Sequence, residues 1–355
     1  MGGGTKTDSG ESMGDPAYLA PWNRLVERNV VARFFDIYFR GAGQVFFQNN
    51  PLTGLLFATG IAYGTIASGT IPVLYGFLIA LFAATWTALL LDLDDASIRK
   101  GLFGFNAALV GVALPTFLAW NGILVGYILL GAVASVIVTL ALTAVLGTWD
   151  GAPLTGPFVV TTWLLLLASY HFGLVGRLPS LGPPTLPAAS PAVPAGLNAL
   201  SFADGFFRGV AQVYFINDLF TGLIFLVAIF VNSRLSGAMA ILGSFLGLFT
   251  ALAFGADPAQ VYQGLFGFNS VLTAIAIGSV FYTIGWRTTI ITAFAAIATA
   301  VVAAGLSTAL SPAGIPILTS AFVITTWAFL TAKKSLAPKH NEPVAESLFG
   351  RQDGS

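Results

Sequence analysis

The sequence lacks cysteine altogether and is poor in charge, since only 8% of its 355 residues are Asp, Glu, Lys or Arg. The absence of cysteine excludes disulfides, thiolate nucleophiles and cysteine-ligated metals. The two histidines, His171 and His340, are far apart and fall near predicted span ends or tails, so no histidine metal cluster is expected. The formal net charge is zero and no basic run stands out, which argues against nucleic acid as a partner. We therefore expect no metal and no cofactor.

Apolar residues dominate what is present. They make up 56% of the chain, and the mean hydropathy is +0.84, whereas roughly a quarter of a soluble globular chain is charged. The sequence therefore predicts an integral membrane protein in contact with the lipid bilayer. No Asp, Glu, Lys, Arg or His falls in the middle of a predicted span, so no acid, base or nucleophile pair supports an intramembrane enzyme.

A hexapeptide occurs twice in the chain. GLFGFN occupies residues 101–106 and returns at 264–269, an offset of 264 − 101 = 163. An Arg-Gly-x-x-Gln-Val-aromatic-Phe segment that begins at Arg40 returns at Arg208, and the Thr-x-x-Phe element at Thr155 returns at Thr319. The chain is thus predicted to consist of two related halves, as many transport proteins do.

Each half is predicted to hold five membrane-spanning helices, preceded by one short re-entrant half-helix. In the first half, the short helix is at Gly43–Asn50 and the spans lie at about 52–69, 72–91, 102–118, 122–147 and 154–170. In the second half, the short helix is at Gly205–Asn217 and the spans lie at about 219–232, 235–253, 265–283, 288–307 and 315–332. Because five crossings is an odd number, the second half enters the membrane from the opposite side. The expected fold class is an all-α polytopic membrane protein with two inverted five-helix repeats around a central pore.

The sequence also predicts where the repeats begin and end. The chain divides into a disordered tail or cloning remnant at 1–16, the first repeat at 17–170, a proline-rich extracytoplasmic connector at 171–197, the second repeat at 198–332 and a disordered cytoplasmic tail at 333–355. The arginines of Ala17–Arg40 favour a helix at the cytoplasmic interface. A basic loop with Arg99 and Lys100 is also placed on that side, so both termini are expected in the cytoplasm.

The repeated motifs supply amides and flat rings rather than charges. Gln44 and Gln212 can bond a solute at the two mouths of a pore, or they can satisfy free backbone groups at a helix end. Phe105 and Phe268 can form flat walls that admit a planar solute edgewise, or they can pack in the core like most membrane phenylalanines. The repetition of both pairs makes the functional alternatives competitive with the structural ones. These groups suit a small, neutral, polar, planar solute.

Two further pairs lie in the same motifs. Inversion places Thr155 and Thr319 opposite each other near the bilayer centre, although a membrane threonine often bonds its own helix instead. Asn106 and Asn269 are expected to bond interrupted backbone more than to line a pore. The glycines of the hexapeptide are expected to let helices approach closely.

Taken together, these motifs resemble the urea transporter family, in particular its bacterial branch, over about residues 20 to 335. The resemblance rests on the Gln-Val-aromatic-Phe segments, the GLFGFN repeats, the Thr-x-Pro-Phe element and the five-span duplication. The family signature Leu-Pro-x-x-Thr-x-Pro-Phe is kept only in part. Ala152 replaces its first proline in the first half, and Ala321 replaces its second proline in the second half.

The resemblance implies a homotrimer in a bacterial inner membrane, with one pore per protomer that passes urea and close analogues passively. Matched by motif, the pore residues would be Gln44, Val45, Phe105, Leu109, Thr155, Gln212, Val213, Phe268, Leu272 and Thr319. Two alternatives stay open at this point. One is a facilitator for another small neutral solute, such as ammonia or a short amide. The other is an ion-coupled secondary transporter, which inverted repeats also permit.

Overall fold

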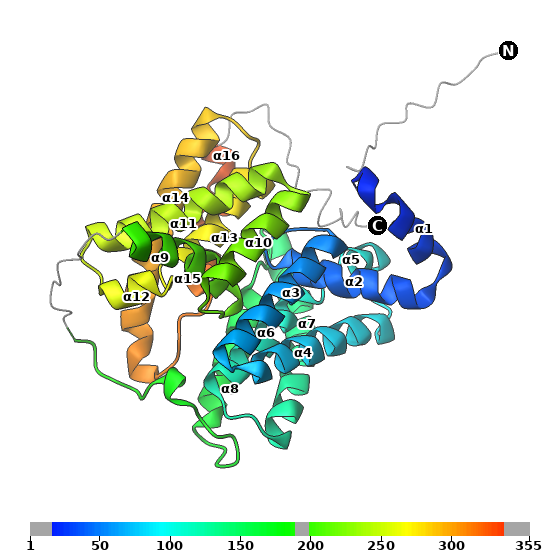
Figure 1. Ribbon diagram of the computed structural model, residues 1–355, viewed down its shortest axis with the longest axis horizontal. Coiled ribbons are helices and arrows are strands. Elements are labelled where there is room, and N and C mark those ends of the chain that lie inside the picture. The colour runs from blue at the N-terminus through cyan, green and yellow to red at the C-terminus, as the bar shows by residue number, and fades with distance from the viewer. Residues whose placement is uncertain (1–15, 189–198, 337–355) are drawn as a thin grey trace.

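The computed structural model describes residues 16–188 and 199–336. Most of the two predicted tails, at 1–15 and 337–355, therefore lies outside the described residues, as does the end of the connector. Within the described residues the chain is helical, and the only β contact is an isolated bridge between Leu118 and Arg177. Figure 1 shows the first half of the chain, in blue and cyan, beside the second half, in green to orange.

The first half contains eight α-helices in chain order. They are α1 (Ala20–Arg28), α2 (Val30–Gln44), α3 (Pro51–Ser68), α4 (Ile71–Leu90), α5 (Asp95–Arg99), α6 (Phe105–Phe117), α7 (Gly122–Gly147) and α8 (Gly156–Ser169). A short 3-10 turn, η1 (Ala17–Leu19), precedes α1, and a second, η2 (Pro179–Leu181), lies in the connector.

The second half repeats this order from the counterpart of α2 onward. Its elements are α9 (Ala199–Ala211), η3 (Gln212–Tyr214), α10 (Leu219–Asn232), α11 (Arg234–Ala253), α12 (Pro258–Tyr262), α13 (Gly267–Ile275), the π-helical η4 (Ala276–Phe281), α14 (Trp286–Leu310), η5 (Ser311–Ala313), α15 (Ser320–Thr331) and α16 (Lys333–Leu336). The last of these corrects the predicted start of the disordered tail. Lys333–Leu336 is helical because the backbone N–H groups of Ser335 and Leu336 both donate to the Ala332 carbonyl.

Five helices of the described chain are long and apolar enough to cross a membrane: α3, α4, α7, α11 and α14. The third and fifth predicted spans of each half are shorter than expected, at α6, α8, α13 with η4, and α15. Left-handed residues delay their starts, with φ of 70° at Gly101, 51° at Leu154, 80° at Gly264 and 52° at Leu318. The non-helical segments before these short helices carry the repeated motifs to the interior.

The two short half-helices also differ from the prediction. The helix expected at Gly43–Asn50 lies earlier in the chain, as α2. The helix expected at Gly205–Asn217 is α9, which ends at Ala211 and is followed by the short η3. Left-handed backbone at Phe47 and Phe215, with φ of 60° at each, turns the chain after each glutamine. The bend between the Leu200–Tyr214 helix and the Leu219–Asn232 helix is 72°, as in a broken span or re-entrant loop.

The single interfacial helix expected over Ala17–Arg40 is in fact divided at Asn29. The Asn29 side chain accepts hydrogen bonds from the backbone N–H of Val31 (2.8 Å) and Ala32 (3.1 Å), which caps α2 at its N-terminus. The extended backbone of Asn29 therefore ends α1 and lets α2 enter the protein interior at a new angle.

The halves meet where α3 lies against α10 (Figure 1). Thr53 donates to the Ala228 carbonyl (3.0 Å), and Thr221 donates to the Gly60 carbonyl (3.2 Å). Gly54 lets α3 approach α2 closely, because a Cβ there would overlap the Phe39 carbonyl oxygen. This contact between halves is therefore made by helices that directly follow the left-handed turns at Phe47 and Phe215.

Candidate functional site

Two threonine hydroxyls meet between the halves. The Oγ1 atoms of Thr155 and Thr319 are 2.6 Å apart, and both residues are buried. Each threonine stands immediately before a short helix, α8 or α15, and neither side chain caps that helix. Neither hydroxyl bonds its own helix, so the back-bonding alternative is wrong for this pair. The lone pairs left over after this mutual bond can accept N–H donors from a solute.

Asparagines of the repeated hexapeptides hold the two threonine segments in place. Asn106 Oδ1 accepts from the Phe158 backbone N–H (3.0 Å), and Asn106 Nδ2 donates to the Leu154 carbonyl (3.4 Å). Each asparagine thus bonds the backbone on both sides of a threonine, which confirms the structural role expected for this pair.

The second asparagine makes the same two contacts. Asn269 Oδ1 accepts from the Phe322 backbone N–H (2.9 Å), and Asn269 Nδ2 donates to the Leu318 carbonyl (3.1 Å). These amides replace the missing side-chain caps of α8 and α15, whose first backbone N–H groups have no partner within the helix.

Two tryptophans that the sequence analysis missed form hydrogen bonds between the halves. Trp163 of α8 donates its indole N–H to the Pro316 carbonyl (2.8 Å), and Trp327 of α15 donates to the Ala152 carbonyl (2.8 Å). The contacts are reciprocal, as in a two-fold interface. A signal was available, because Thr-Thr-Trp at 161–163 returns at 325–327, an offset of 325 − 161 = 164.

The repeated glutamines use one end of their amides to bond backbone. Gln44 Nε2 donates to the Lys100 carbonyl (2.8 Å), and Gln212 Nε2 donates to the Gln263 carbonyl (3.0 Å). Each carbonyl precedes the left-handed glycine of a hexapeptide. No hydrogen bond from the described chain reaches Oε1 of either glutamine, so both oxygens remain available as acceptors. The amide nitrogens therefore bond backbone carbonyls, as the structural alternative of the sequence analysis expects, and binding of a solute by the amide oxygens stays a prediction.

A cavity of ≈ 20 Å³ lies beside the threonine pair. It is lined by Gln44, Val45, Phe47, Leu102, Phe105, Leu154 and Thr155. Four of these seven were predicted as pore residues, and Phe47, Leu102 and Leu154 were not. The volume is enough for about one water molecule. The described residues offer no group of three or more His, Asp or Glu side chains that could hold a metal ion.

The other predicted pore residues lie outside this cavity lining. Leu109, Val213 and Leu272 are fully or almost fully buried, and Thr319 reaches the lining only through its contact with Thr155. Gln212 and Phe268 are also buried, in positions of the second half that correspond to Gln44 and Phe105. The geometry thus brings four of the five predicted residues of the first half together at one cavity, all but Leu109, and does not do so for the second half.

The phenylalanines that follow the glutamine segments cross to the opposite half. The Phe47 ring lies 6.1 Å from Phe322, and the Phe215 ring lies 6.1 Å from Phe158, both edge-on. These rings sit at the left-handed turns after α2 and η3, so each turn is held by packing against the other half. No sequence signal predicts this, because phenylalanine rarely occupies that backbone region.

Helices of spanning length, paired half-length helices and an uncharged internal cavity define a polytopic helical membrane transport protein with two related halves. A model of the urea transporter family matches residues 35–334, and the chain belongs to that family. It is 32% identical over 349 residues to urea transporter 1 of Ovis aries. The aligned region covers 96% of this chain and 87% of the relative. Urea transporter 1 of Rattus norvegicus is 32% identical over 347 residues, with the same coverage. The family assigns urea transport across the membrane to the chain and makes it a transporter rather than an enzyme.

Proposed function

We propose that the chain is a passive, selective urea channel whose path runs past the Thr155–Thr319 pair. The observation that carries this proposal is the uncharged cavity where a free amide oxygen, a flat ring and a threonine hydroxyl converge on one side. Urea is planar, and its N–H donors lie in the molecular plane. Acceptor oxygens along its edges can replace lost water while Phe105 contacts its face.

The test compares solutes in liposomes that contain the purified chain. We expect urea to cross faster than acetamide or thiourea, and the rate to be unchanged when ion gradients are dissipated. A facilitator of broader specificity would pass acetamide and thiourea at rates close to that of urea. An ion-coupled transporter would lose urea uptake when the gradients are removed.

The reciprocal contacts between halves support an inverted arrangement of the two repeats. In such an arrangement, residue pairs such as Trp163 with Pro316 and Trp327 with Ala152 exchange places across a two-fold axis. We place both termini in the cytoplasm because Arg99 and Lys100 follow α4, whereas the corresponding loop before Gly264 has no basic residue. Residence in a bacterial inner membrane and assembly as a homotrimer stay predictions, which native mass measurement and labelling of introduced cysteines can test.

Replacing Phe105 with alanine is expected to raise the thiourea-to-urea permeability ratio about threefold or more, because a flat wall of the cavity is lost. Phe268→Ala tests the corresponding position in the second half. Phe103→Ala is the matched control, since Phe103 belongs to the same hexapeptide and is equally buried, at 8% exposed, but does not line the cavity. An unchanged ratio in both test variants would reduce the two rings to packing residues.

A further inference from the structure

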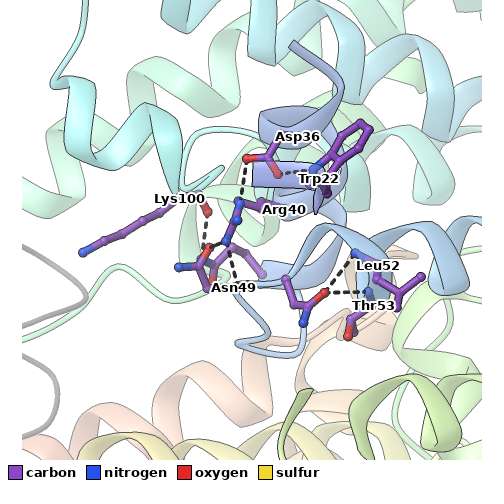
Figure 2. Close-up of polar contacts among 9 residues, drawn as sticks. Trp22, Asp36, Arg40, Asn49, Leu52, Thr53 and Lys100 are labelled. Carbon is purple, nitrogen blue, oxygen red and sulfur yellow. Dashed lines mark hydrogen bonds and ion pairs between the residues drawn. The ribbon is translucent and has the colours of Figure 1, made fainter. Parts of the chain in front are cut away.

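A buried ion pair lies in α2, where its arginine precedes the cavity residue Gln44 by one helical turn. In α2, Arg40 Nε donates to Asp36 Oδ2 at 2.8 Å, and the two side chains are only 7% and 9% exposed. Figure 2 shows the pair between α1 and the turn that follows α2. A buried charge is costly unless it is paired and further hydrogen-bonded. The further hydrogen bonds of Asp36 and Arg40 therefore show which parts of the chain the pair connects.

Arg40 fastens the turn that forms one wall of the cavity. Its Nη1 donates to both the backbone carbonyl and the Oδ1 of Asn49, at 3.0 Å each (Figure 2). Asn49 closes the turn 45–50, which contains the cavity residues Val45 and Phe47. The guanidinium thus holds this turn by two charge-assisted hydrogen bonds.

Trp22 completes the arrangement from α1, a helix with no counterpart among the described elements of the second half. Its indole N–H donates to Asp36 Oδ1 at 2.7 Å (Figure 2), so each carboxylate oxygen of Asp36 has its own donor. Trp22 belongs to α1, the segment that the capping residue Asn29 separates from α2. The position of α1 therefore fixes Asp36, and Asp36 fixes Arg40.

The second half has the same charges without this arrangement. Arg208 pairs with Asp204 at 3.0 Å, but the two side chains are 29% and 33% exposed. Arg208 Nε is buried and has no hydrogen-bond partner, and Asn217, the counterpart of Asn49 at the offset of 168, is exposed. No hydrogen bond to the turn 213–218 is made by Arg208 within the described structure.

The second half also lacks a tryptophan in the matching position. The residue at the offset of 168 from Trp22 is Ser190, which has no indole. The described part of the connector is occupied elsewhere, since the Leu178 N–H donates to the Phe117 carbonyl (2.9 Å) and the Thr185 N–H donates to the Ser311 carbonyl (2.9 Å). The difference between the halves is thus present in both the sequence and the contacts.

We infer that Trp22 and Asp36 are positioning residues that hold rigid the mouth of the passage formed by α2 and the turn 45–50, whereas the described residues around α9 and the turn 213–218 form no such clamp. The clamp acts through Arg40 and the turn 45–50, and it touches no solute. Its consequence for urea rests on the proposed channel function, whereas its consequence for backbone motion does not. The two are therefore measured separately.

Amide hydrogen exchange of the full chain in lipid vesicles tests the clamp without urea. Trp22→Phe keeps an aromatic ring and removes the N–H donor, and we expect it to accelerate exchange in 45–50 by about tenfold. Exchange in 213–218 should change by less than about twofold, since that turn does not depend on α1. Asp36→Asn should accelerate 45–50 in the same way, and Asp204→Asn, its matched control, should leave both turns unchanged.

Urea permeability at matched amounts of assembled protein tests the positioning role. We expect Trp22→Phe to lower it about threefold and to raise the thiourea-to-urea ratio, because the wall formed by Val45 and Phe47 loosens. Unchanged exchange in 45–50 for both Trp22→Phe and Asp36→Asn would overturn the clamp. Accelerated exchange with unchanged permeability and selectivity would overturn its positioning role. If the unmodified chain passes no urea, the proposed function fails, and the exchange comparison still decides the clamp.

Discussion

Thr155→Val is expected to lower urea permeability about fivefold, which corresponds to the loss of a net hydrogen bond of about 1 kcal/mol at the barrier. Valine keeps the shape of threonine and removes the hydroxyl that faces Thr319 at 2.6 Å. At this depth a solute has lost most of its water, so an unmet N–H is costly. Stopped-flow uptake in liposomes at matched protein amounts measures the effect.

The geometry adds two controls to this experiment. Because the hydroxyls bond each other, Thr155→Val and Thr319→Val should not be additive, and the double variant should resemble either single one. Thr161→Val is the matched control, since Thr161 is buried in α8 and its hydroxyl has no hydrogen-bond partner. That change should leave flux intact. Normal flux in both Thr155→Val and Thr319→Val would remove these two residues from the site.

Asn106→Leu is expected to cost about 3 kcal/mol of stability, because the Phe158 N–H and the Leu154 carbonyl would both be left buried without their partner. Asn269→Leu should have a similar effect through Phe322 and Leu318. Thermal unfolding in detergent and the yield of folded protein measure the loss.

A second asparagine cap provides the comparison. Asn121 caps α7 at an exposed site, where its Oδ1 accepts from the Leu124 N–H at 2.8 Å. Asn121→Ala should therefore cost only about 1 kcal/mol. If the Asn106 and Asn269 variants are no less stable than the Asn121 variant, the asparagines are not what holds the threonine segments.

Hydropathy and repetition predicted the long elements well. The α7 helix spans the predicted 122–147, and α3 begins one residue before the predicted 52. The short elements were predicted less well because their ends depend on single backbone conformations. Sequence rules look for glycine or asparagine where a helix ends in left-handed backbone. Phe47 and Phe215 take that conformation because rings of the opposite half hold them, which a local pattern does not show.

The contacts of the candidate site were likewise predictable from the sequence only in part. The pairing of Thr155 with Thr319 could be predicted from the repeat, because an inverted arrangement would bring equivalent positions together. The contact between Trp22 and Asp36 could not be predicted, since α1 has no counterpart among the described elements of the second half and the contact depends on the break at Asn29. Repetition in the sequence predicts the contacts that the two halves share. Contacts that differ between the halves can be found only in the three-dimensional structure.

The narrow cavity beside Thr155 bears on the kinetics of the proposed path. A space of ≈ 20 Å³ has room for about one water molecule, so molecules that cross there cannot overtake one another. Isotopically labelled urea that moves against unlabelled urea would be held back by the molecules ahead of it. Tracer exchange at equal concentrations would then be slower than net flux under a gradient, and the ratio of opposing tracer fluxes would vary more steeply than the ratio of concentrations.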